Sequence, residues 1–126
     1  MFIGHYAPAL IAAAHPRAPQ LGTLFIAAQL VDIGFFTLAL LDVEHMRIVP
    51  GLTVMNPMDL YDMPYTHSLV GTLCWATAMA IIVLVFGRGR ASTMTAAAIA
   101  AAVVVSHWLL DLLVHRPDLT IAGQPP

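Results

Sequence analysis

Lysine is absent from this chain of 126 residues, and charged residues of either sign make up only 10% of it. Soluble domains carry about 25% charged residues, so this chain has too few to cover a surface that faces water. Hydrophobic residues reach 60%, and the mean hydropathy is +0.83. The composition therefore predicts a protein embedded in a lipid bilayer.

Basic residues and cysteine are scarce as well. The five basic residues are scattered arginines, namely Arg17, Arg47, Arg88, Arg90 and Arg116. Binding to nucleic acid requires a basic stripe that neutralises phosphates, so we expect no nucleic-acid partner. The one cysteine, Cys74, excludes an intramolecular disulfide and is expected to pack as a small hydrophobic residue.

Three apolar stretches predict transmembrane helices at about residues 21–41, 66–86 and 91–114. Each reaches the roughly 20 residues that cross about 30 Å of hydrocarbon, and only a helix pairs all its backbone groups over so short a span. A shorter stretch at 2–14 predicts a short or half-spanning first helix, or alternatively a segment lying flat at the interface. The expected fold is a single all-α membrane domain over residues 1–126, with three full spans and a short N-terminal helix.

The links between these helices indicate an orientation. Arg17 lies between the first two helices, and Arg88 and Arg90 lie between the last two. The positive-inside rule places these links in the cytoplasm, so a loop at 42–65 and a polar tail at 116–126 would face outward. We expect the tail to be loosely ordered.

Asp32 is the most informative single residue, because it lies in the middle of the second predicted helix. A carboxylate near the middle of a bilayer costs about 2.5 to 3.5 kcal/mol on the insertion scale. Such a residue is normally paired, protonated, bound to a metal or placed in a wet cavity. The alternative to a functional role is a neutral Asp32 that is hydrogen-bonded to another helix.

The last predicted helix carries His107, Asp111 and His115, spaced by four residues. This spacing places them on one face of a helix, where an imidazole and a carboxylate one turn apart can hold a cation. The alternative for His107 and Asp111 is a structural hydrogen bond between neighbouring turns. His115 lies nearer the membrane boundary, where simple exposure explains it equally well.

Two further histidines open helices. Thr66 is predicted to be the N-cap of the third helix, which places His67 in its first turn. His5 opens the first helix. Each histidine is weak evidence alone, whereas His15 and His45 lie in links and are expected to be exposed.

Depth along the helices tests whether these residues can meet. With a rise of about 1.5 Å per residue, His5, Asp32, His67, His107 and Asp111 all fall in the outer half of the bilayer. His67 and Asp32 nevertheless differ in depth by more than one zinc shell spans, since its bonds are about 2 Å. Either the helices are tilted and offset, or the site holds two metals, or one residue is not a direct ligand.

The chain resembles a bacterial family of inner-membrane metal-dependent hydrolases that is often compared with zinc-dependent phospholipase C. The matching residues are Gly4-His5, Asp32, Thr66-His67-Ser68-Leu69 and Ser106-His107 with Asp111. This chain has one acid in "QLVDIG" where the family commonly has a "PDID"-like segment, and it has "DMPY" where the family commonly has "HRG". The resemblance implies a divalent metal ion, with zinc favoured, and metal ligands among His5, Asp32, His67, His107 and Asp111.

Three functions remain open at this point. The resemblance implies a hydrolase that acts on a phosphoester or lipid headgroup near the outer face of the inner membrane, with Asp32 or Asp111 as carboxylate ligand or general base. The first alternative is a non-enzymatic membrane subunit whose polar residues hold helices together or bind a cofactor such as haem. The second is a proton or metal-ion carrier, which would need a homo-oligomer because one chain supplies few helices.

Overall fold

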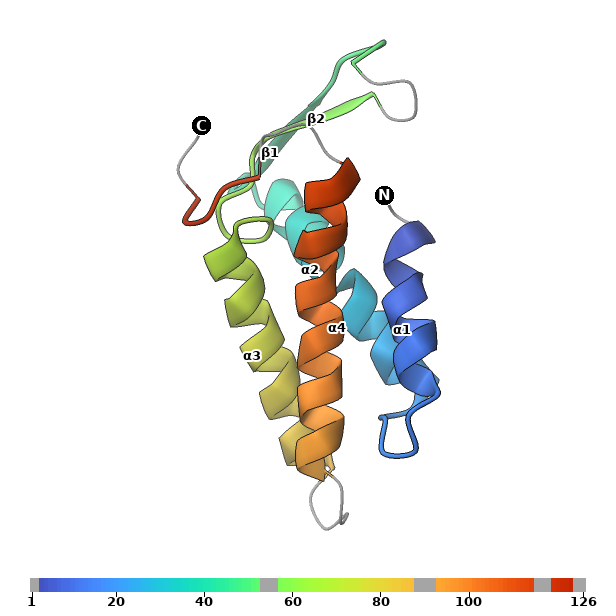
Figure 1. The fold of residues 1–126 in the computed structure, drawn as a ribbon. Coiled ribbons are helices and arrows are strands. Elements are labelled where there is room, and N and C mark those ends of the chain that lie inside the picture. Colours follow the sequence, from blue (N-terminus) through green and yellow to red (C-terminus); the bar gives the residue numbers. More distant parts are fainter. Residues whose placement is uncertain (1–2, 53–56, 88–92, 115–118, 124–126) are drawn as a thin grey trace.

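A computed structural model describes residues 3–52, 57–87, 93–114 and 119–123. Figure 1 shows a helical bundle with a small hairpin at one end. In chain order the elements are η1 (Ile3–His5), α1 (Tyr6–Ala13), α2 (Leu21–Leu40), β1 (His45–Ile48), β2 (Met58–Asp62), α3 (Leu69–Phe86) and α4 (Thr93–Val114). The predicted all-α membrane bundle, with three long helices and a short first one, is therefore confirmed.

Helices α2, α3 and α4 have the length and composition of membrane spans. They contain 20, 18 and 22 residues, and between 22% and 39% of their apolar windows is buried within the protein. The rest of this apolar surface faces outward, which suits lipid and not water. Cys74 lies on the exposed surface of α3, not in the core. The chain is an integral membrane protein.

Small side chains build the core where the helices meet. The buried cluster consists of Ala9, Leu24, Ala27, Ala28, Val31, Ala76, Met79, Ala100, Val103 and Val104. Alanine allows helix backbones to approach closely in lipid, and the most extensive helix contact is the one between α3 and α4. The first helix contacts both α2 and α4, and its Ala9 is fully buried. It is therefore part of the bundle and does not lie flat on its surface.

The loop at 42–65 contains a hairpin that its sequence did not reveal. Strand β1 pairs antiparallel with β2, and His45 lies opposite Asp62 while Arg47 lies opposite Asp59. An ion pair of 2.7 Å joins Arg47 Nε to Asp59 Oδ2. The hairpin stands at the same end of the bundle as η1, whereas the link between α1 and α2 lies at the opposite end (Figure 1).

The start of α3 differs from the prediction. Ser68, and not Thr66, is the N-cap, because Ser68 Oγ accepts a hydrogen bond from Gly71 N. Ser68 Oγ also donates to Pro64 O at 2.6 Å. Thr66 and His67 therefore precede the helix, and the hydroxyl of Thr66 is free to bond elsewhere.

The polar tail also contributes to the start of α3. The amides of Leu69 and Val70 donate to the carbonyls of Thr120 and Ile121, each at 3.0 Å. The first amides of a helix have no acceptor inside it, and the tail supplies two. The expectation of a loosely ordered tail is therefore wrong for residues 119–123, while 115–118 and 124–126 lie outside the described residues.

Candidate metal centre

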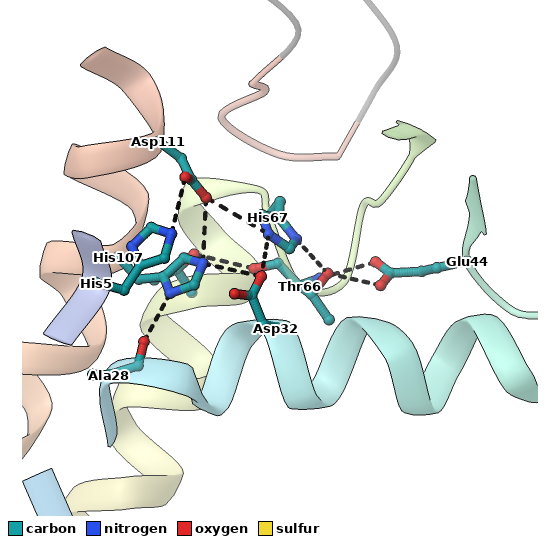
Figure 2. A network of polar contacts seen from close by, with 9 residues as sticks. His5, Ala28, Asp32, Glu44, Thr66, His67, His107 and Asp111 are labelled. Atoms are coloured by element: carbon teal, nitrogen blue, oxygen red, sulfur yellow. Dashed lines mark hydrogen bonds and ion pairs between the residues drawn. The ribbon is translucent and has the colours of Figure 1, made fainter. Parts of the chain in front are cut away.

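Four separate segments bring three histidines and two aspartates together (Figure 2). His5 comes from η1, Asp32 from α2 and His67 from the segment before α3, while α4 supplies His107 and Asp111. Ligand atoms of Asp32, His67 and His107 all lie within 4.8 Å of one another, and so do those of His5, His107 and Asp111. The five residues singled out in the sequence thus lie in one cluster.

The predicted gap in depth between His67 and Asp32 is wrong, since His67 Nε2 lies 3.4 Å from Asp32 Oδ1. The depth argument assumed parallel helices ending on one plane. Instead, α2 crosses the bundle obliquely (Figure 1), and it continues to Leu40 beyond the level of Asp32. Tilted and offset helices, the first of the three explanations, account for the meeting.

Each aspartate faces more than one imidazole. Asp32 Oδ1 lies 3.4 Å from both His67 Nε2 and His107 Nε2. Asp111 Oδ1 lies 3.2 Å from His5 Nε2, while its Oδ2 lies 3.3 Å from His107 Nε2 and 3.7 Å from His67 Nε2. His107 therefore stands between the two carboxylates and belongs to both groups.

Burial separates Asp32 from the rest of the cluster. The side chains of the three histidines and Asp111 are at most 2% exposed, whereas that of Asp32 is 15% exposed. The cluster thus reaches the surface of the protein on the side of Asp32. The other members are sealed by the packed helices.

The orientation of His107 is fixed by the backbone of α2. Its Nδ1 lies 2.9 Å from the carbonyl oxygen of Ala28, and a carbonyl only accepts, so Nδ1 carries the hydrogen. In the neutral ring Nε2 then holds a lone pair. This nitrogen is buried, and it makes no hydrogen bond within the part of the chain that the structure describes.

The rings of His5 and His107 stack on each other. Their centroids are 3.7 Å apart and their planes differ by 9°. Two positively charged rings would repel each other strongly at this distance in a buried site. The stacking therefore favours at least one neutral imidazole in the cluster.

Two residues beside the cluster were not predicted to belong to the site: Glu44 was not singled out in the sequence, and Thr66 was expected only as an N-cap and as part of the motif resemblance. Glu44 is 1% exposed and Thr66 is fully buried, and Thr66 Oγ1 lies 2.9 Å from His67 Nδ1. Glu44 follows α2 in a loop that holds three other acids, so its sequence position carried no signal. Its burial is a consequence of the tertiary structure alone.

The remaining histidines lie apart from the centre. His15 is exposed, and its Nδ1 accepts a hydrogen bond from Arg17 N. His45 is partly buried in the hairpin, where a hydrogen bond from its Nδ1 to the Asp62 carboxylate raises the pKa of the imidazole above its usual 6.5. His115 lies outside the described residues.

Comparisons of this chain with models of protein families, with curated proteins and with solved structures found no match.

Proposed function

We propose that this protein is a metal-dependent hydrolase of the bacterial inner membrane, with zinc as its metal and a phosphoester or lipid headgroup as its substrate. The observation that carries the metal proposal is the buried Nε2 of His107, which makes no hydrogen bond within the described residues, faces two carboxylates and in the neutral ring holds a lone pair. A lone pair and carboxylate oxygens repel one another unless a proton or a cation lies between them. The hydrolytic activity is supported by the resemblance to the membrane hydrolases.

The spacing of the donor atoms fits a zinc shell. A tetrahedral zinc ion with bonds of about 2.0–2.1 Å keeps neighbouring ligand atoms roughly 3.3–3.4 Å apart. Asp32 Oδ1 lies 3.4 Å from Nε2 of both His67 and His107. Catalytic zinc sites commonly use three protein ligands and leave a fourth position for water, and these three residues match that composition.

A zinc ion held by Asp32, His67 and His107 would act as a Lewis acid and make a water molecule acidic enough to react near neutral pH. Asp111 is the proton acceptor in this proposal, because its carboxylate faces the same imidazoles and is held by His5 at 3.2 Å. Hydrolysis joins the oxygen of water to phosphorus as the ester P–O bond breaks. Asp111 would take the proton of the water and then give it to the leaving oxygen.

The exposed edge of Asp32 supports a substrate approaching from that side. Asp32 is the one member of the cluster with appreciable exposure. It lies toward the end of the bundle that carries the acidic hairpin, which the arginine pattern places outside the cytoplasm. A headgroup at the outer surface of the membrane would be within reach of this edge.

Elemental analysis of gently purified protein tests the metal centre. Wild type should retain zinc, and His107→Ala and Asp32→Asn should lose it while still inserting into the membrane. His15→Ala is the matched control, because His15 is exposed and lies apart from the cluster. Wild-type protein free of bound metal, or variants with unchanged metal, would refute the proposal.

Release of headgroups from phospholipid vesicles tests the activity. Asp111→Asn should keep most of its zinc and lose about 10²- to 10⁴-fold in rate, which is the usual contribution of a general base. Loss of zinc in this variant would instead make Asp111 a ligand. Zinc-loaded wild type that releases no headgroup and cleaves no soluble phosphoester would contradict hydrolysis.

The ion-pair geometry also favours a second candidate, a non-enzymatic subunit in which the cluster holds the helices together. Protonated histidines could pair with Asp32 and Asp111 at the observed 3.2–3.7 Å. This candidate predicts a protein without zinc and a large fall in melting temperature in Asp111→Asn, because breaking a buried pair costs about 3–5 kcal/mol. A Soret absorption band would indicate haem instead.

A further inference from the structure

Glu44 is a buried acid outside the candidate ligand set. Its carboxylate points toward Thr66, which lies between it and His67 (Figure 2), and the residue is 1% exposed. Its Oε1 accepts hydrogen bonds from the amides of Tyr65 and Thr66 at 2.8 and 3.0 Å. Its Oε2 accepts from Thr66 Oγ1 at 2.7 Å. Burial of a carboxylate is costly unless such bonds satisfy it, and here three donors do so.

The hydroxyl of Thr66 links Glu44 to His67. A hydroxyl has one hydrogen, and that of Thr66 is donated to Glu44. Thr66 Oγ1 can then only accept from His67 Nδ1, which lies 2.9 Å away. Nδ1 consequently carries the hydrogen, and in the neutral ring Nε2 presents its lone pair to Asp32 Oδ1 at 3.4 Å.

We propose that Glu44 is a positioning residue that acts through Thr66 to hold His67 in the tautomer able to bind a metal through Nε2. The inference rests on the metal centre proposed above. His107 is held in the same tautomer by a different acceptor, the carbonyl of Ala28. Two histidines from different segments thus turn the same nitrogen toward Asp32, each with its own acceptor behind it. Acceptors of this kind orient metal-binding histidines and raise their basicity.

Glu44 also fixes the backbone beside His67. Its bonds to two successive amides hold residues 65 and 66 in place, and Thr72 Oγ1 donates to Thr66 O at 3.1 Å. The imidazole therefore has little freedom to turn its other nitrogen inward.

Replacing Glu44 with glutamine should invert this chain of hydrogen bonds while keeping the shape of the side chain. The amide oxygen would remain with the two backbone donors, and the NH₂ group would face Thr66 Oγ1. Thr66 would accept from glutamine and donate its own hydrogen to His67 Nδ1. The hydrogen of the imidazole would then sit on Nε2 and point at the metal position.

Zinc affinity, measured by competition with a chromogenic chelator in detergent, tests this prediction. E44Q should bind zinc about 10- to 100-fold more weakly than wild type, which is the usual effect of losing such an acceptor. D59N is the matched control, because it removes one negative charge from the hairpin and Asp59 pairs with Arg47. Equal affinity of E44Q and wild type, or an equal loss in D59N, would overturn the role of Glu44.

A double variant distinguishes an effect of E44Q on the tautomer of His67 from a general destabilisation of the fold. T66V removes the hydroxyl that donates to His67 Nδ1 in E44Q, so E44Q/T66V should bind zinc more tightly than E44Q alone. A purely structural or purely electrostatic role for Glu44 predicts no such rescue, because T66V adds a second lesion and changes no charge. A double variant as weak as E44Q or weaker would therefore contradict the proposal.

Nitrogen NMR of ¹⁵N-histidine-labelled protein gives a direct reading in the zinc-loaded wild type, with the His67 signals assigned from H67N. Nδ1 should carry the hydrogen, and Nε2 should show the shift of a metal-bound nitrogen. Zinc on Nδ1, or a His67 ring unaffected by zinc, would refute the role of Glu44 even where the protein binds metal. Wild type that binds no zinc would refute the metal centre itself, so the two failures are distinguishable.

Discussion

Gly71→Ala should disturb the proposed metal centre without touching any of the proposed ligands. A Cβ atom at Gly71 would lie 2.4 Å from the carbonyl oxygen of Tyr65 and 2.7 Å from its carbonyl carbon. Ordinary contact begins at 3.4 Å, so the Tyr65 carbonyl must withdraw by about 1 Å, the difference between 3.4 and 2.4 Å. The obstacle is backbone and not the end of a flexible side chain, so the whole segment before α3 must move.

This displacement is large on the scale of a metal site, where distances must hold within about 0.2 Å. The peptide that moves joins Tyr65 to Thr66, next to His67, and its amide donates to Glu44. Overpacking of this kind costs about 1–3 kcal/mol, against roughly 1 kcal/mol gained when alanine replaces glycine in a helix. We therefore expect a small change in stability and a loss of at least about tenfold in zinc affinity.

Chelator competition and thermal unfolding on the same preparations measure these two effects. Gly22→Ala in α2 is the matched control, because a Cβ there would meet nothing within 4 Å. It should bind zinc as wild type does. Gly71→Ala protein with wild-type zinc affinity would show that the segment at 65–67 does not set the geometry of the centre.

Two further predictions concern the end of the bundle that carries the hairpin. The pairing of His45 with Asp62 raises the pKa of His45. The pairing therefore stabilises the folded hairpin fully below the unfolded pKa of 6.5, and this stabilisation is lost as pH rises through the folded pKa. Asp62→Asn should lower the pKa of His45 in an NMR titration, and an unchanged titration would contradict the pairing. Ser68→Ala removes the N-cap of α3 and should cost about 1 kcal/mol, seen as a lower melting temperature, whereas Ser68→Thr keeps the hydroxyl and should lose less.

The helices were predictable because the membrane imposes a simple rule on the sequence. Long uncharged runs had to span, and polar residues inside them, such as Asp32 and His107, stood out against that background. In a soluble protein, where charged residues are common, an aspartate or a histidine in a helix would not have indicated a functional site. Because charged residues are scarce, both the fold class and the candidate cluster could be predicted from the sequence.

Tertiary features were not predictable in the same way. The depth argument separated His67 from Asp32 because sequence carries no information on helix tilt. The role proposed for Glu44 depends on its burial against Thr66. No feature of the sequence around Glu44 distinguishes it from the other acids of the loop at 42–65. Likewise, the carbonyls of Thr120 and Ile121 accept hydrogen bonds from backbone amides of α3. Backbone hydrogen bonds of this kind do not depend on the residue type, so the sequence does not predict them.

The scattering of the cluster along the chain has a consequence for biosynthesis. His5 is made more than a hundred residues before Asp111, its partner. Asp32 is made well before His107, so it carries its insertion cost of about 2.5 to 3.5 kcal/mol unrelieved by that imidazole until α4 arrives. The strongly apolar remainder of α2 must carry the helix into the bilayer, and α4 completes the cluster when it arrives. Premature termination before α4 would leave Asp32 without His107, one of the two imidazoles that face it.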